Sequence, residues 1–163
     1  MLIHEDGTGL ADAESYVSVE DANVYHGARS NSLWDLAEQD LKESSLRKAT
    51  DFIDAVYGGR WIGTPLLETQ GLSFPRHGTS WNGVPVPLKR ALFELALRVV
   101  SGTELFADAA EKTKSEKIGP IEVEYDLSEL SGDRFGWLND FLRPLLKVAR
   151  KGGSSPWVKT YPT

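Results

Sequence analysis

Two groups of side chains could in principle carry chemistry, and neither has an arrangement that is specific to a reaction. His4, His26 and His77 are far apart, and none stands at metal-ligand spacing from another. Glu122 and Glu124 could be paired catalytic carboxylates, although a solvated strand face is the commoner origin of such a pair. The chain also lacks cysteine, a phosphate-binding glycine loop and a Gly-x-Ser-x-Gly elbow. We therefore expect no enzyme activity, no metal and no cofactor.

Aromatic residues outside regular elements are better candidates for function. Trp61, Trp81 and Trp157 fall in segments that show no helical or strand periodicity. Such rings can anchor an interface, stack the bases of a single strand, or pack a loop onto the core. Trp157 follows the flexible stretch 152–156, so we expect the C-terminal end to dock on a partner, with a frayed terminus as the alternative.

Basic residues gather at the C-terminal end of an acidic chain. The formal net charge is −6, and residues 143–163 carry five Lys or Arg and no acid, so residues 1–142 carry −11. This balance excludes a protein whose whole surface binds nucleic acid. Contact with DNA or with an acidic partner should be local, unless the basic residues only aid solubility. The residues expected to make it are Arg143, Lys147, Arg150, Lys151 and Lys159.

The elements that position these residues are mainly helical. Residues 85–102 predict a buried central helix, with Pro87 in its first turn and Gly102 at its stop. Further helices are expected over 19–29, from a cap at Ser18, over about 40–57, from a cap at Asp40, and over 134–148. Pro144 predicts a break of the last helix near residue 142. Apolar positions Leu46, Ala49, Ile53 and Val56 should form the core face of the second helix, and Trp34 and Leu36 should anchor the segment before it.

Two segments lack the apolar periodicity of a helix. Residues 60–86 form a long loop without a period, and loops of that length are often functional. Ile121, Val123 and Tyr125 alternate with glutamates, which predicts either a hairpin turning at residues 119–120 or one strand that pairs with another chain. The sequence therefore predicts a mainly α fold, a bundle of about four helices with a long loop and a small β-hairpin or strand. Residues 1–151 would form the helical domain, and residues 152–163 a flexible docking tail.

The order of several short motifs resembles a known family. The motifs are SYVSVEDA (15–22), YHGARSN (25–31), LRKATDFID (46–54), LSFPR (72–76), VPLKRA (86–91), IGPIEVEY (118–125) and LRPLL (142–146). Together, over about residues 14–147, they resemble tailed-phage proteins labelled DnaT-like single-stranded-DNA-binding proteins. They also look like the helical head-completion adaptors, or head–tail connectors, of long-tailed phages.

The connector resemblance implies a structural virion protein assembled in the host cytoplasm. About twelve copies would form a ring at the head–tail junction, in the viral neck, and the genome would pass through it on ejection. Its partners would be the portal protein, a tail or stopper protein, further copies and the passing DNA, with no membrane. Residues expected between subunits are Phe74, Pro75, Arg76, Trp81, Ile121, Val123 and Tyr125. Residues expected to dock on the portal are Trp157, Val158 and Tyr161.

The alternative is a single-stranded-DNA-binding protein that acts in phage replication. That function needs a basic groove lined with aromatic side chains. Only the C-terminal stretch is rich in basic residues, and −11 over the rest of the chain suits a DNA conduit better than a DNA-binding surface. The sequence therefore favours the connector. Affinity for oligonucleotides, and its fall with added salt, separates the two functions.

Overall fold

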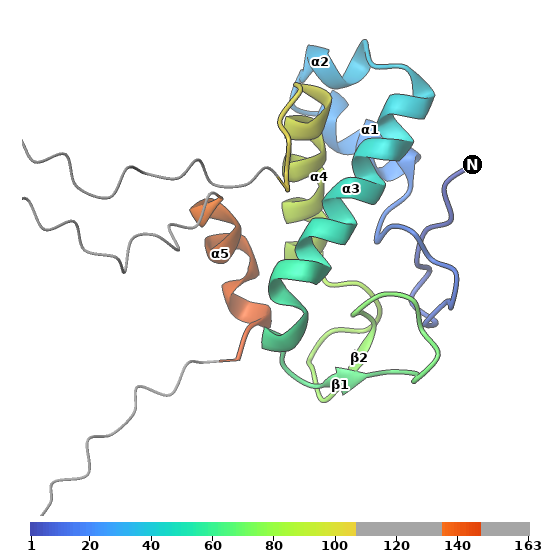
Figure 1. The fold of residues 1–163 in the computed structure, drawn as a ribbon, viewed down its shortest axis with the longest axis vertical. Coiled ribbons are helices and arrows are strands. Elements are labelled where there is room, and N and C mark those ends of the chain that lie inside the picture. The colour runs from blue at the N-terminus through green and yellow to red at the C-terminus, as the bar shows by residue number, and fades with distance from the viewer. Residues whose placement is uncertain (107–134, 148–163) are drawn as a thin grey trace, which may run out of the picture.

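The computed structural model describes residues 1–106 and 135–147 (Figure 1). This part of the chain contains five α-helices and one two-stranded antiparallel sheet, which confirms the predicted mainly α fold. The elements are α1 Val19–Gly27, α2 Ser32–Asp35, α3 Gln39–Tyr57, β1 Thr64–Pro65, β2 Arg76–His77, α4 Val86–Val100 and α5 Gly136–Leu142, with short 3₁₀ turns η1 Gly58–Arg60 and η3 Arg143–Leu145. None of the described helices combines the length and apolar character that a bilayer crossing requires.

The core lies between α3 and α4, which run side by side in opposite directions (Figure 1). α5 packs against α4, and α1 with α2 closes the other end of the bundle. The largest fully buried side chains are Trp34, Trp61, Tyr16, Tyr57, Phe74, Leu46, Ile53, Leu88, Leu92, Leu95, Leu138 and Leu142.

The central helix forms where the sequence predicts it. α4 begins after Pro85, and its apolar residues are buried against both α3 and α5. At its end Gly102 has φ +90° and donates its N–H to Val99 O at 2.9 Å, while Thr103 donates to Arg98 O at 2.9 Å. This pair of bonds is the Schellman motif, which closes helices with a left-handed glycine.

The first helix confirms its predicted cap, but other local predictions are wrong. The Ser18 hydroxyl accepts from the Asp21 N–H at 3.0 Å, as expected, and α1 then ends at residue 27. The predicted cap at Asp40 is wrong, because α3 begins at residue 39 and places Asp40 inside its first turn. Leu36 is 83% exposed and Val56 is 42% exposed, so neither has the predicted core role.

The long loop contains the small sheet and is tied to α3. β1 and β2 pair Thr64 with His77 and Pro65 with Arg76. The Asp54 carboxylate accepts from the Tyr16 hydroxyl and from the Ser73 N–H, which holds the loop against the helix. The strand predicted over residues 116–126 lies outside the described residues.

The predicted break in the last helix is confirmed. α5 ends at Leu142, and Pro144 lies in the 3₁₀ turn that follows. Beyond it, the Lys147 N–H donates to Arg60 O at 2.8 Å, and Leu145 O accepts from the Ile62 N–H at 3.0 Å. These bonds fix the end of the described chain to the C-terminal end of α3.

Candidate nucleic-acid interface

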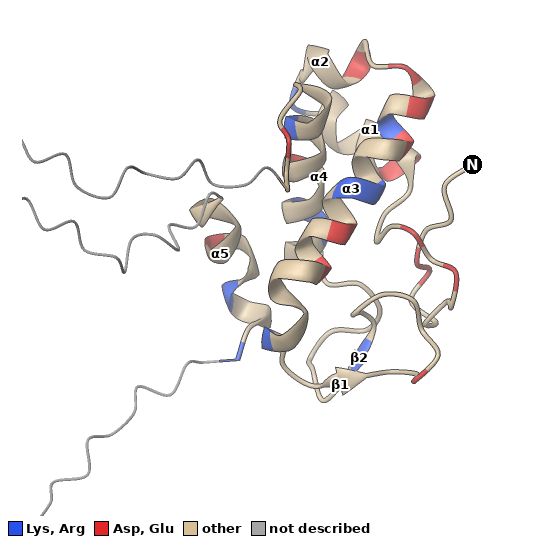
Figure 2. Ribbon diagram, in the orientation of Figure 1, with Lys and Arg blue, Asp and Glu red and all other residues tan. Residues whose placement is uncertain are grey.

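Acidic and basic residues occupy different parts of the fold. Residues 1–57 contain twelve Asp or Glu and four Lys or Arg. The described residues from 58 onward contain four Asp or Glu and seven Lys or Arg. Figure 2 marks acidic residues along the N-terminal segment and at the end where α2 meets α3, and basic residues in the turn η3 after α5 and at the opposite end of α3. The acidic total therefore conceals a side of the molecule with an excess of positive charge.

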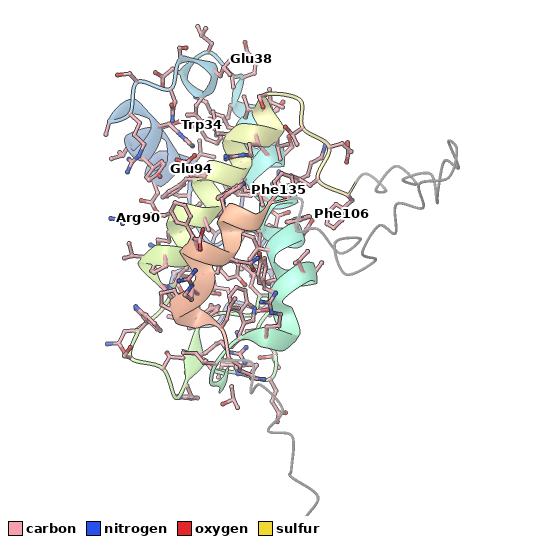
Figure 3. The ribbon with its side chains drawn as sticks, turned by 90° about the vertical axis from the view of Figure 1, so that its left-hand side faces the viewer. Trp34, Glu38, Arg90, Glu94, Phe106 and Phe135 are labelled. Atoms are coloured by element: carbon pink, nitrogen blue, oxygen red, sulfur yellow. The ribbon has the colours of Figure 1, made fainter. Side chains whose placement is uncertain are left out.

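The polar edge of α4 lies on this basic side. Arg90, Glu94 and Arg98 follow one another at four-residue intervals, which places them on one edge of an otherwise apolar helix. Figure 3 shows Arg90 and Glu94 on that edge. Glu94 is satisfied locally, since it pairs with Arg98 at 3.7 Å and accepts from the Tyr25 hydroxyl at 2.9 Å. No carboxylate in the described part of the chain pairs with Arg90.

An arginine lies over an aromatic ring on each side of this edge. On α5, the Trp137 ring centre is 4.0 Å from the guanidinium carbon of Arg98. On α1, the Tyr25 ring centre is 3.5 Å from the guanidinium carbon of Arg29. We refer to Tyr25, Arg29, Arg90, Arg98 and Trp137 as the arginine–aromatic face. Three helices hold it in place, because α1 and α5 both pack against α4.

The chemistry of this face suits a flexible polyanion that carries flat rings. Guanidinium groups bind phosphate with several donors, and their planes accept a stacked base. Aromatic side chains stack bases without regard to sequence. Burial, followed by the hydrogen bond to Glu94, raises the pKa of Tyr25, so its phenol stays neutral and adds no negative charge to the face.

Comparison with known families agrees with this chemistry. Residues 1–160 match the family model described as "Putative DnaT-like ssDNA binding protein". The chain belongs to this family. Neither the curated proteins nor the solved structures give a match.

The family description corrects the function that the sequence favoured. It names single-stranded-DNA binding, so the head–tail connector was the wrong choice and the alternative is better supported. The sequence argument summed the charge of residues 1–142, whereas the described residues from 58 onward contain three more basic than acidic residues. No observation on this chain tests the ring, the portal and tail partners or the virion location that accompanied the connector prediction.

Two of the predicted DNA-contact residues lie in the described chain that follows α5. Arg143 is largely exposed and pairs with Asp140 at 2.7 Å. Lys147 donates its ammonium to Gly59 O at 3.4 Å, beside Arg60. These residues extend the basic side of the DnaT-like fold beyond α5. The other three, Arg150, Lys151 and Lys159, lie outside the described residues.

Four of the seven residues predicted to lie between subunits are described, and these four make contacts within their own chain. Phe74 is 1% exposed and packs edge-on against Trp61, and Pro75 is also buried. Arg76 donates to the carbonyl oxygens of residues 62, 63 and 73, and Trp81 packs partly buried on the core. The remaining predicted contacts, Ile121, Val123, Tyr125, Trp157, Val158 and Tyr161, lie outside the described residues.

The loop also borders an open cleft of about 750 Å³. Asp54 and Glu68 line it together with Arg76, whose guanidinium already donates to three carbonyl oxygens. Two carboxylates would repel a phosphate backbone, and the one arginine beside them already uses its donors within the loop. Among the described residues no cluster of three or more His, Asp or Glu could hold a metal ion.

Sequence reasoning missed the whole arginine–aromatic face. Its members come from three helices, so no local motif marks them. One usable signal was present, because Arg90 and Arg98 interrupt a helix that is apolar almost all round. The shift from acidic to basic composition after residue 57 was a second signal.

Proposed function

We propose that this DnaT-like protein binds single-stranded DNA through the arginine–aromatic face. The observation that carries the proposal is the arrangement around Arg90, an arginine free of ion pairs within the described residues and flanked by two arginine–ring pairs. The family description supports the same activity. Replication of a phage genome, where duplex DNA is opened, is the role that the sequence resemblance implies.

Phosphates would bind along the arginine edge of α4. Arg90 and Arg98 are eight residues apart, which is about 12 Å along a helix axis. Arg90 and Arg29 would contact the backbone of the strand, and bases would stack on Trp137 and on the outer planes of the guanidinium groups. The basic residues Arg143 and Lys147 would continue the path toward the end of α3. Contacts of these types read no base edges, so binding should be largely independent of sequence.

Replacing Trp137 by Ala tests the proposal. Loss of one stacking platform costs about 1 to 3 kcal/mol, so affinity for a dye-labelled oligonucleotide should fall about 5- to 150-fold. Fluorescence anisotropy at fixed salt measures the change. Phe106→Ala is the matched control, since this ring is 56% exposed and lies outside the face, and it should bind like the wild type.

Three further measurements separate binding from folding. Circular dichroism establishes that each variant is folded. A second variant, Arg98→Gln, removes the cation beside the Trp137 ring and keeps the ring itself. Arg98→Gln should also weaken binding. A duplex of the same sequence should bind more weakly than the single strand, because its bases are not free to stack. A folded Trp137→Ala variant with wild-type affinity, or a wild-type protein without affinity for the oligonucleotide, would refute the proposal.

A further inference from the structure

Three leucines are exposed at the end of the molecule where α2 meets α3. Leu33 is 58% exposed, Leu36 is 83% exposed and Leu41 is 42% exposed. The first two are one helical turn apart, and the third lies in the first turn of α3. Trp34, between them in sequence, is fully buried, so the segment is packed on the core while the leucines remain exposed. We refer to these three residues as the leucine end.

The leucine end is surrounded by acids that lack basic partners. Asp35, Glu38 and Asp40 are exposed, and none of them pairs with a Lys or Arg of residues 1–106 or 135–147. Figure 3 shows Glu38 at this extremity, and Figure 2 marks acidic residues there in red. An apolar surface with an unpaired acidic rim is complementary to a segment that combines apolar rings with basic residues.

The chain itself contains such a segment. Residues 148–163 carry Arg150, Lys151 and Lys159 and no acid, together with Trp157 and Tyr161. We propose that the leucine end of one copy binds residues 148–163 of a second copy. Trp157 and Tyr161 would cover the leucines, and the basic residues would pair with the acidic rim.

Distance favours a second copy over the same chain. Residue 147 is bonded at the C-terminal end of α3, whereas the leucine end lies at its N-terminal end (Figure 1). The 19 residues of α3 span about 28 Å. Only ten residues, from 148 to 157, separate the end of the described chain from Trp157. They reach about 33 Å only when fully extended, and the path must also pass around the bundle. A neighbouring molecule meets no such constraint.

The contact would join unlike surfaces and leave each copy with one surface free. Such head-to-tail contacts build open chains unless a rotation closes them. The arginine–aromatic face shares no residue with the leucine end or with residues 148–163, so the contact would leave it open. If the proposed function also holds, neighbouring copies would bind one strand cooperatively, as is usual for proteins that cover single strands. Only this consequence depends on the proposed function.

Sedimentation velocity of the full chain tests the contact. The mean sedimentation coefficient of the wild type should rise with protein concentration. Leu36→Glu disables the leucine end and Trp157→Ala disables the docking segment, so each variant alone should stay monomeric. An equimolar mixture of the two should form a dimer, since one retains an intact segment and the other an intact leucine end. Leu67→Glu, at a leucine 45% exposed on the distant loop, is the matched control and should associate like the wild type.

Each other outcome overturns the proposal. A wild type that remains monomeric at every concentration excludes the contact. Self-association that persists in either variant excludes these surfaces, and a mixture that forms no dimer excludes their pairing. Anisotropy with an oligonucleotide that accommodates only one copy measures DNA binding separately from self-association. Both variants should bind it like the wild type, so failure of the proposed function leaves the sedimentation result intact.

Discussion

At the scale of the residue, His26 is a buried histidine that packs among aromatic rings. Its ring is fully buried, lies 4.5 Å from the Trp34 ring and meets Tyr25 edge-on at 5.2 Å. Nδ1 is 2.9 Å from the amide nitrogen of Asn31, which can only donate, so Nδ1 accepts and the proton is assigned to Nε2. Nε2 has no partner among the described residues. Burial is the main cause that lowers the pKa of His26, so the neutral ring is the one that the fold accommodates.

Acidification should therefore destabilise the protein through His26. A histidine whose pKa is lowered on folding contributes its full stability above the unfolded pKa, about 6.5, and loses it as the pH falls below that value. We expect the free energy of unfolding, from urea titrations between pH 7.5 and 5.5, to decrease by up to about 1.4 kcal/mol per pH unit below 6.5 from this one group. His26→Gln should be less stable at pH 7.5 but should lack this decrease.

Comparison of the wild type with His26→Gln isolates the contribution of His26 to the pH dependence of stability. Burial raises the pKa of Asp54, which acts in the opposite direction at acid pH, and this contribution is common to wild type and variant. Equal pH dependence in wild type and His26→Gln would show that another group is responsible.

At the scale of the element, the C-terminal end of α4 sets the direction in which the chain continues. Gly102 takes a left-handed conformation, φ +90°, and the chain then turns so that Leu105 is buried at 4% exposure. A Cβ added at Gly102 would meet no atom within 4 Å. The cost of a side chain there is therefore conformational rather than steric.

Gly102→Ala should lower the free energy of unfolding by about 1 to 2 kcal/mol, the usual cost of a left-handed residue with a Cβ. Gly27→Ala is the matched control, because Gly27 ends α1 and its Cβ would also meet nothing within 4 Å. The control should be neutral or stabilising by up to about 1 kcal/mol. Urea denaturation measures both, and similar effects at the two positions would contradict the left-handed assignment.

At the scale of the whole molecule, the distribution of charge matters more than its sum. Residues 1–57 are strongly acidic and the described residues after 57 carry a basic excess, so the net charge of −6 does not describe every part of the surface. Long-range repulsion from the acidic side is screened over about 8 Å at physiological salt, and contacts on the basic side are shorter than that.

Salt dependence should locate the DNA contacts. The logarithm of the binding constant falls with the logarithm of salt concentration, with a slope of about −0.7 for each phosphate neutralised on a single strand. Arg90→Ala should weaken oligonucleotide binding and reduce the magnitude of this slope by about 0.7. Glu38→Gln, which removes a charge from the acidic side, should leave the slope unchanged. Anisotropy titrations over a series of NaCl concentrations test both, and an unchanged slope in Arg90→Ala would place the phosphate contact elsewhere.

The sequence by itself determined the features that depend on neighbours along the chain. The cap at Ser18, the extent of α4, its stop at Gly102 and the break at Pro144 all follow from local backbone rules, and the structure confirms them. The cap expected at Asp40 failed for a related reason, since helix starts without a side-chain cap carry no sequence mark.

Only the tertiary structure decided which side chains meet. Arg98 lies over Trp137 from 39 positions away, and Tyr25 donates to Glu94 from 69 positions away. Phe74, which was predicted to lie between subunits, is buried in the core, and Trp81 packs partly buried against it. Asp54 ties their loop to α3 through the Ser73 N–H. The arginine–aromatic face and the exposed leucines both arise from packing of distant elements, whose pairing depends on burial in three dimensions and not on local periodicity.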